Sequence, residues 1–285
     1  MPSKSYKSAT DFRKALEHRL QNEAEKSEQN LQRLRRKVAF NRFLARIFSD
    51  SGSPWILKGG YAMELRLVHA RATRDIDLAL RGKPQGAGVK QTVYIQDLLS
   101  NALAKDLGDF FAFRVGSVQM ELNGPLYGGA RYPVESLLDN RLFVSFHVDV
   151  AVGDYIPTEL ETGQEQDLVS FAGIKPAVFT MIPREVQFAE KLHAYTMPRS
   201  VPNSRVRDLV DMVLLIQEGK LSPGKSRAAL KAVFARRKSH DVPAVLEPAP
   251  DRWKKSFAEM AGECGLEIDL NEGFEILKRF YSKII

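Results

Sequence analysis

The sequence predicts a mixed α/β (α+β) protein in which helices precede and follow a central sheet region. Three observations point to this class. Apolar residues recur every three to four positions in the first 48 residues, alternate with polar ones in short runs between residues 50 and 155, and return to helical spacing after Pro183. The chain has 285 residues, 44% of them hydrophobic, which is enough for a core without disulfides. We expect a bilobed molecule: a mixed-sheet core with N-terminal helices, and a helical C-terminal lobe.

The N-terminal part, 1–49, is predicted to form two basic helices over 9–29 and 31–48. Residues 1–50 contain twelve Lys/Arg and six Asp/Glu, a net +6 of the +7 carried by the whole chain. Such a surface favours polyanions such as nucleic acid, although a solvated helix face is the simpler explanation for any single arginine. The candidate RNA contacts are Arg33, Arg35, Arg36, Lys37 and Arg42.

The region 50–182 is predicted to be the α/β core. "WILKGG" has the pattern of a short strand that ends in a glycine turn, "YAMELRLVH" has helical spacing, and "RDIDLAL" alternates as a strand. A flexible connection at 82–90 leads to a helix over 91–106. Further strands are expected in "FAFRVGSVQMEL" and "FVSFHVDVAVGD", with one more short strand or loop before Pro183.

Residues 183–285 are predicted to form the helical lobe, because Pro183 suits the first turn of a helix. A proline-rich connector, "HDVPAVLEPAPD", separates two of its helices. The expected helices cover 184–197, 204–218, 223–236, 251–263 and 271–283.

Composition excludes several classes of protein. With Cys264 as its one cysteine, the chain cannot build a disulfide framework or a multi-cysteine metal site. The first twenty residues lack the apolar segment of a signal peptide, and no run approaches 18 apolar residues. We expect a soluble, cytoplasmic protein with no membrane partner.

Two aspartates interrupt an otherwise apolar strand. Alternate side chains of a strand share a face, so Asp75 and Asp77 point the same way, about 7 Å apart. They repel unless a cation lies between them, and Mg²⁺ prefers a few carboxylate oxygens plus substrate phosphates. Asp149, in the apolar run "FVSFHVDVAV", is a candidate third ligand; an ion pair with an arginine such as Arg74 is the alternative. Three carboxylates holding two Mg²⁺ ions form the clamp used for in-line phosphoryl transfer.

A lysine and two glycines precede the predicted helix between the first two strands. Glycines let the backbone approach a ligand closely, and free amides at a helix N-terminus bind phosphate. Gly59 and Gly60 are therefore candidates for binding a nucleoside triphosphate, with Lys58 adding a positive charge.

The segments "LKGGYAMELRL…RATRDIDLAL", "FHVDVAVGD" and "EKLHAYTMP…SRVRDLVDMVLL" resemble the AbiEii/MenT family, and the resemblance covers most of the chain. The family consists of nucleotidyltransferases of the polymerase-beta-like superfamily, known as toxins of type IV or related toxin–antitoxin systems. The resemblance implies a polymerase-beta-like core and a cognate antitoxin protein. It also implies transfer to the 3′ end of tRNA, where added nucleotides block aminoacylation and translation.

The resemblance also implies roles for individual residues. Asp75, Asp77 and Asp149 match the family's metal-binding aspartates, and Gly59 and Gly60 match its helix start. Lys191 would contact the nucleotide phosphates, and Asp208 would position Lys191 or the substrate. Arg207 and Asp211 complete a basic-Asp-x-x-Asp segment at the nucleotide site, and Tyr61 departs from the Ser or Thr that often follows the glycines.

The sequence therefore predicts a Mg²⁺-dependent nucleotidyltransferase. Lys58, Arg74 and Lys191 are expected to stabilise the leaving pyrophosphate. Two alternatives stay open: transfer of a nucleotide to a protein or small-molecule hydroxyl, and a catalytically silent RNA- or partner-binding module on the same fold. The sequence does not specify the nucleotide, the acceptor RNA, the number of nucleotides added or the oligomeric state.

Overall fold

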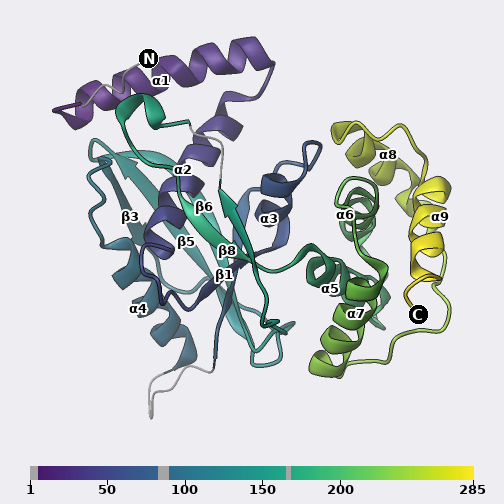
Figure 1. Ribbon diagram of the computed structural model, residues 1–285. Coiled ribbons are helices and arrows are strands. Elements are labelled where there is room, and N and C mark those ends of the chain that lie inside the picture. The colour runs from purple at the N-terminus through teal and green to yellow at the C-terminus, as the bar shows by residue number, and fades with distance from the viewer. Residues whose placement is uncertain (1–5, 83–89, 165–167) are drawn as a thin grey trace. The chain divides into compact units, whose positions relative to one another are not determined.

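The computed structural model describes residues 6–82, 90–164 and 168–285, and the chain divides into two compact units (Figure 1). Unit 1 consists of the described parts of Met1–Leu57, Arg74–Gly153 and Thr162–Met181. Unit 2 consists of Lys58–Thr73, Asp154–Glu161 and Ile182–Ile285. Most of the connection expected at 82–90 lies outside the described residues. The three-part division into 1–49, 50–182 and 183–285 stays a prediction.

Unit 1 is built on a mixed sheet, which confirms the expected α/β class. Among the described residues the strand order is β3-β5-β6-β2-β1-β8-β7, with β4 paired to β5. β2 is parallel to β6 and β1 to β8, whereas β5 is antiparallel to β3, β4 and β6. The strands are β1 (Trp55–Lys58), β2 (Asp75–Leu80), β3 (Phe111–Val115), β4 (Met120–Glu121), β5 (Gly129–Leu138), β6 (Arg141–Val152), β7 (Glu161–Gln164) and β8 (Val178–Met181).

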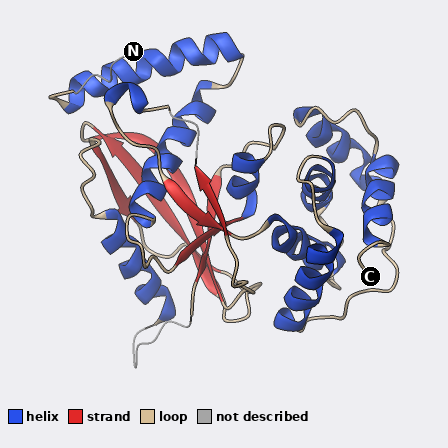
Figure 2. Ribbon diagram, viewed as in Figure 1, coloured by secondary structure: helices blue, strands red, loops and turns tan. Residues whose placement is uncertain are grey.

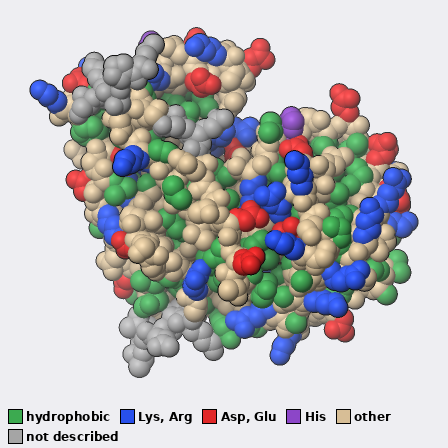
Figure 3. Space-filling view, in the orientation of Figure 1, with side chains coloured by type: hydrophobic (Ala, Val, Ile, Leu, Met, Phe, Trp, Pro, Cys, Tyr) green, Lys and Arg blue, Asp and Glu red, His purple; other side chains and the backbone are tan. Residues whose placement is uncertain are grey.

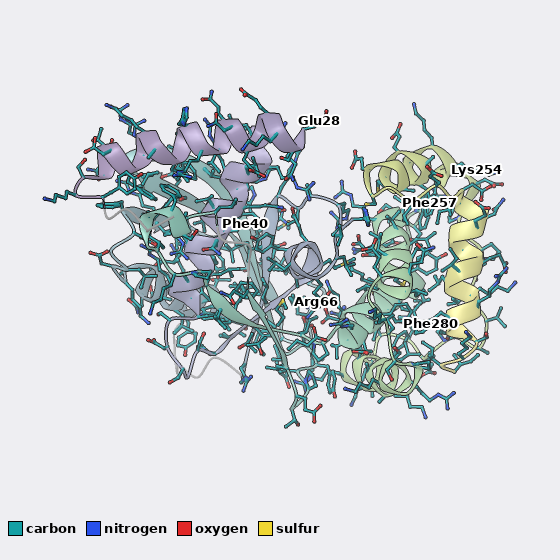
Figure 4. The ribbon with its side chains drawn as sticks, turned by 45° about the horizontal axis from the view of Figure 1, so that its top comes forward. Glu28, Phe40, Arg66, Lys254, Phe257 and Phe280 are labelled. Carbon is teal, nitrogen blue, oxygen red and sulfur yellow. The ribbon has the colours of Figure 1, made fainter. Side chains whose placement is uncertain are left out.

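Helices α1 (Ala9–Ser27), α2 (Leu31–Ile47) and α4 (Gln91–Leu103) belong to unit 1 (Figure 2). α2 packs against β6 and β8, and α4 packs against β3 and β5. The rings of Phe40 and Phe43 on α2 meet Phe146 of β6 edge-on, with centroids 4.9 and 5.5 Å apart. Figure 4 labels Phe40 on α2. Because successive strand residues face opposite sides, the carboxylates of Asp75 and Asp149 lie on the other, polar face.

One expectation for the strands is wrong, and one strand was not predicted. The run over 111–122 is broken, because β3 ends at Val115 and β4 covers only Met120–Glu121. The sequence interpretation also missed β5 (Gly129–Leu138), which lies between β3 and β6. Pro133 sits in the middle of β5, and proline in a run usually argues against a central strand. The strand could have been recognised by its alternation: Ala130, Tyr132 and Val134 are buried, and polar or half-buried residues lie between them.

Unit 2 contains α3 and the helices of the C-terminal half, close to the expected boundaries. They are α3 (Gly59–Arg66), α5 (Arg184–Thr196), α6 (Val206–Gln217), α7 (Pro223–Arg237), α8 (Lys254–Glu263, after a 3₁₀ turn at Asp251–Trp253) and α9 (Leu270–Tyr281). α6 packs against α5, α8 and α9, and α5 also packs against α7. Phe257 and Phe280 are buried between these helices (Figure 4). No helix in the described part of the chain has the length and apolar character needed to cross a bilayer.

Candidate functional site

The predicted aspartates meet on the polar face of the unit 1 sheet. In the parallel pair of β2 and β6, Asp77 is the register partner of Asp149, and Asp75 is the partner of His147. Neighbouring strands lie about 4.8 Å apart, so the Asp77 and Asp149 side chains emerge side by side. The side chains of Asp75 and Asp149 are 33% and 16% exposed, which leaves both accessible to a small ligand. The structure thus brings the three carboxylates together.

Arg131 on β5 is the arginine that pairs with this cluster. It is the register partner of Asp149, and its Nε and Nη2 atoms each donate to one Asp149 oxygen at 2.7 Å. Its Nη2 also lies 3.5 Å from Asp75 Oδ2. The hydrogen bonds to Asp149 raise the pKa of Arg131, and the charges of Asp149, Asp75 and Asp77 add to this, against an opposing effect of burial. The partner of Asp149 is therefore Arg131 rather than Arg74.

The carboxylates fit Mg²⁺ in kind, because oxygen ligands suit that ion. Their arrangement fits only in part. No group of three Asp, Glu, His or Cys side chains in the described residues is placed to hold a metal ion, and both oxygens of Asp149 are engaged by Arg131. Mg²⁺ is commonly bound by only one or two carboxylates plus substrate phosphates. Asp75 and Asp77 match such a set in kind, whereas the Asp149 oxygens are held by Arg131.

A pocket of about 480 Å³ opens beside Asp75 in unit 1. Arg36 from α2 and Arg74 line it together with His147, whose Nδ1 lies 3.4 Å from Asp75 Oδ1. The other lining residues are Pro133, Val134, Glu135, Ser145 and Phe146. Two residues predicted separately for RNA and nucleotide binding, Arg36 and Arg74, therefore share one pocket next to a candidate metal ligand.

The two glycines at the start of α3, in unit 2, are required for different structural reasons. Gly59 has φ +66°, a conformation that other residues adopt only under strain. Gly60 allows close packing: a Cβ there would lie 2.9 Å from Thr73 Oγ1. Tyr61 is buried at 1% exposure, so its side chain takes part in the core. The backbone amides of the first helical turn remain the group suited to phosphate.

Lys58, just before α3, is held in a largely buried ion cluster of unit 2. Its Nζ binds Asp154 and also Glu190 Oε1 at 2.9 Å, and Arg237 Nη2 donates to Asp154 Oδ1 at 3.2 Å. Burial alone would lower the pKa of Lys58, but Asp154 and Glu190 outweigh it and the pKa is raised. The sequence interpretation missed Asp154, Glu190 and Arg237, since their meeting depends on tertiary folding.

A second ion cluster of unit 2 contains the two aspartates of the basic-Asp-x-x-Asp segment, Asp208 and Asp211. Lys191 Nζ lies 2.5 Å from Asp211 Oδ2 and 3.4 Å from Asp208 Oδ1. Arg71 donates to both oxygens of Asp211 at 3.1 Å. Asp211 is 1% exposed, whereas Arg207 is exposed at the surface. The structure thus joins Lys191, Asp208 and Asp211 but does not bring Arg207 to them.

Four of the five residues predicted to contact RNA lie on α2 with partly exposed side chains, and their contact with RNA stays a prediction. Arg33, Arg35, Arg36 and Lys37 are partly exposed; Arg35 pairs with Glu17 at 2.6 Å. On the face shown in Figure 3, basic side chains are interspersed with acidic ones, so the charge is not gathered into one patch there.

Arg42 does not belong to the predicted set of RNA contacts. It is buried at 2% exposure, lies 3.5 Å from Asp109 and donates to the Lys175 carbonyl at 3.0 Å. Arg46 binds both oxygens of the same Asp109, at 2.9 and 2.6 Å. Arg42 is thus a core ion-pair residue and not an RNA contact. Its spacing of four and eight residues from buried Val38 and Leu34 was a signal that it faces inward.

A mixed sheet that carries clustered aspartates on one face, with helices on the other, is an architecture suited to phosphoryl chemistry. A model of the family described as nucleotidyl transferase AbiEii toxin, type IV toxin–antitoxin system, matches residues 42–278. The chain belongs to this family of nucleotidyltransferase toxins, as the sequence motifs predicted.

Two crystal structures from Helicobacter pylori are similar to the chain at low sequence identity. JHP933 is 16% identical, with a TM-score of 0.46, over 90% of this chain and 96% of that chain. A candidate nucleotidyltransferase is 15% identical, with a TM-score of 0.47 and the same coverage. No match to a curated protein was found.

Proposed function

We propose that the protein transfers a nucleoside monophosphate from a nucleoside triphosphate to a hydroxyl of an RNA, in the manner of MenT toxins. The observation that carries the proposal is the alignment of Asp77 with Asp149, and of Asp75 beside them, on one polar sheet face. A binding module that receives an anionic ligand gains nothing from three clustered acids, whereas a phosphoryl-transfer site needs them.

Asp75 and Asp77 would hold Mg²⁺, two ions in the complete site, and Asp149 would join them once released from Arg131. When bound, the metal supplies positive charge against the phosphates and favours ionisation of the acceptor hydroxyl. The carboxylates of Asp75 and Asp77 would fix the position of that positive charge. No side chain in this proposal serves as a covalent nucleophile, since the acceptor hydroxyl itself attacks the α-phosphorus and pyrophosphate leaves.

Unit 2 provides one set of proposed nucleotide contacts, and Arg74 of unit 1 is a separate candidate phosphate contact. The amides of Gly59 and Gly60 suit a phosphate at the helix start. Lys191 has three N–H donors; within the described parts of the chain Asp211 and Asp208 accept two of them, which leaves one for a phosphate. Asp211 is too buried to meet the nucleotide and would act by positioning Lys191. Exposed Arg207 would contact the substrate only from the surface.

Lys58 has a different proposed role from the one expected. Both of its carboxylate partners lie in the same buried cluster, so a pyrophosphate would have to replace Asp154 or Glu190 to bind it. Lys58 is better suited to fixing the start of α3 than to stabilising the leaving group directly.

The proposed acceptor is the 3′ end of tRNA, so that the added nucleotides block aminoacylation and translation. Support comes from the membership of the AbiEii family and from the arginines in the pocket beside Asp75, which suit a phosphodiester backbone. The type IV toxin–antitoxin system of the family implies an antitoxin as a further partner.

The experiment is transfer of label from each of the four α-³²P nucleoside triphosphates, with Mg²⁺, in the presence and absence of total tRNA. RNA-dependent label is the expected result. Label on the protein alone would favour protein nucleotidylation, and label on an added small molecule would favour that acceptor class. A folded protein that binds tRNA but transfers no label would be a silent binding module.

A further inference from the structure

Arg131 supplies positive charge to the aspartate cluster. Its guanidinium binds both oxygens of Asp149 at 2.7 Å and reaches Asp75 Oδ2 at 3.5 Å. Arg131 and Asp149 are register partners on β5 and β6, so the strand ladder fixes both backbones opposite each other. The pairing is therefore anchored by the backbone of the sheet as well as by the two hydrogen bonds.

We propose that Arg131 competes with the divalent cation for Asp149, so that the cation binds Asp149 only after the guanidinium gives up at least one of its two hydrogen bonds. This inference rests on the proposed function, because it takes the aspartates of the cluster to be the cation's ligands.

The competition follows from the geometry of the pair. Two-pronged arginine–carboxylate pairs are among the strong, geometrically specific hydrogen bonds of proteins. Both Asp149 oxygens are used, and the guanidinium also extends toward Asp75, where the cation would bind. A guanidinium and a divalent cation a few ångströms apart repel each other. Arg131 therefore keeps the acids from repelling one another without metal, and it lowers their affinity for metal.

A purely supporting role for Arg131 predicts the opposite effect of its removal. If the arginine only holds Asp149 in the correct rotamer for the cation, loss of the guanidinium weakens cation binding. If it competes, loss of the guanidinium strengthens cation binding. The sign of the change in metal affinity distinguishes the two roles, without any measurement of catalysis.

The test uses Mn²⁺ as the probe, without nucleotide, and follows the electron paramagnetic resonance signal of free Mn²⁺ during titration of the full chain. Arg131→Gln is expected to bind Mn²⁺ about tenfold more tightly than the wild type. Arg131→Lys, which keeps a charge but loses the two-pronged geometry, is expected to lie between them. Arg114→Gln, which removes an exposed arginine of β3 in the same sheet, is the matched control and should bind as the wild type does.

The other outcomes separate this inference from the proposed function. Affinity that is unchanged or weaker in folded Arg131→Gln, but still lost in Asp77→Asn, overturns the competition and leaves the metal site standing. Absence of Mn²⁺ binding in both wild type and Arg131→Gln, or binding that Asp77→Asn does not reduce, overturns the metal site itself. If Arg131→Gln does not fold, as judged by circular dichroism, Arg131→Lys carries the comparison.

Discussion

Asp77 on β2 and Asp149 on β6 are direct register partners in a parallel strand pair. The two residues are 72 positions apart in the sequence, yet the strand ladder fixes their side chains on the same face. A one-residue change of register would move one carboxylate to the apolar side against α2. The pairing of β2 with β6 is therefore what converts two separate aspartate motifs into one site.

Replacement of Asp77 by Asn should remove catalysis and spare the fold. The substitution keeps the side-chain shape and removes the charge that the proposed metal ion needs, so the transfer rate should fall about 10²–10³-fold or more. The measurement is single-turnover label transfer, with thermal unfolding as the check on the fold. Asp97→Asn, at an exposed position of α4 in the same unit, should retain full activity. Equal losses in both variants would contradict a special role for Asp77.

Replacement of Asp211 by Asn should destabilise unit 2. Asp211 is 1% exposed and pairs with Lys191 and Arg71, so the change leaves two cations without their shared counter-charge. Breaking a buried ion pair costs about 3–5 kcal/mol, which urea unfolding would detect. Asp251→Asn, at a surface pair with Lys254 in the same unit, is the control and should leave the unfolding midpoint unchanged.

The ion pairs of Asp211 should also make the stability of the protein depend on pH. Burial would raise the pKa of Asp211, but Lys191 and Arg71 outweigh it and lower the pKa below its usual 3.8. Because the folded value is depressed, the stabilisation is present above pH 3.8 and is lost as the pH falls from there through the folded pKa. The free energy of unfolding, measured between pH 5 and about 2.5, should fall more steeply in wild type than in Asp211→Asn. Parallel curves would show that Asp211 has no such contribution.

Substitution of Arg42 should reduce stability, whereas substitution of Lys37 should mainly affect RNA binding. Arg42→Met removes the buried ion pair with Asp109 and the charge-assisted hydrogen bond to the Lys175 carbonyl, and should lower the free energy of unfolding by about 1.5–3 kcal/mol. Lys37→Ala, at a partly exposed position of the same helix, should change it by about 1 kcal/mol or less. In fluorescence anisotropy titrations, Lys37→Ala should reduce the salt dependence of tRNA binding by about one unit of slope. An effect on that slope from folded Arg42→Met instead would contradict its assignment to the core.

Gly60→Ala should strain the start of α3. The new Cβ would lie 2.9 Å from Thr73 Oγ1, so the segment around Thr73 must shift, at a cost of about 1–3 kcal/mol. Thr73→Ala removes that oxygen, and the double variant should recover part of the loss in a double-mutant cycle. Gly262→Ala on α8, where a Cβ would meet open space, is the control and should be neutral or stabilising by up to about 1 kcal/mol. Additive effects of the two changes would show that the contact with Thr73 is not the cause.

The sequence allowed the prediction of the parts of the site that follow from local periodicity. Alternation along β2 and β6 placed Asp75, Asp77 and Asp149 on polar positions of apolar strands, and helical spacing located most helices within a few residues. Arg131 was missed because Pro133 concealed the strand that carries it.

The remaining misses concern partners that are distant in the sequence. Lys58 is 96 positions from Asp154, and no local pattern predicts that they meet. Arg42 sits in an arginine-rich helix, where the abundance of surface charge concealed an inward-facing position that its spacing from Val38 indicated. In each case the missing information is the identity of the tertiary partner.

The most direct test of the central claim compares intact tRNA with periodate-oxidised tRNA, whose terminal 3′ hydroxyl is destroyed, as acceptors of α-³²P-labelled nucleotides. The account predicts label on intact tRNA alone, dependent on Mg²⁺ and absent in Asp77→Asn. Equal labelling of oxidised tRNA, or undiminished labelling by Asp77→Asn, would contradict it.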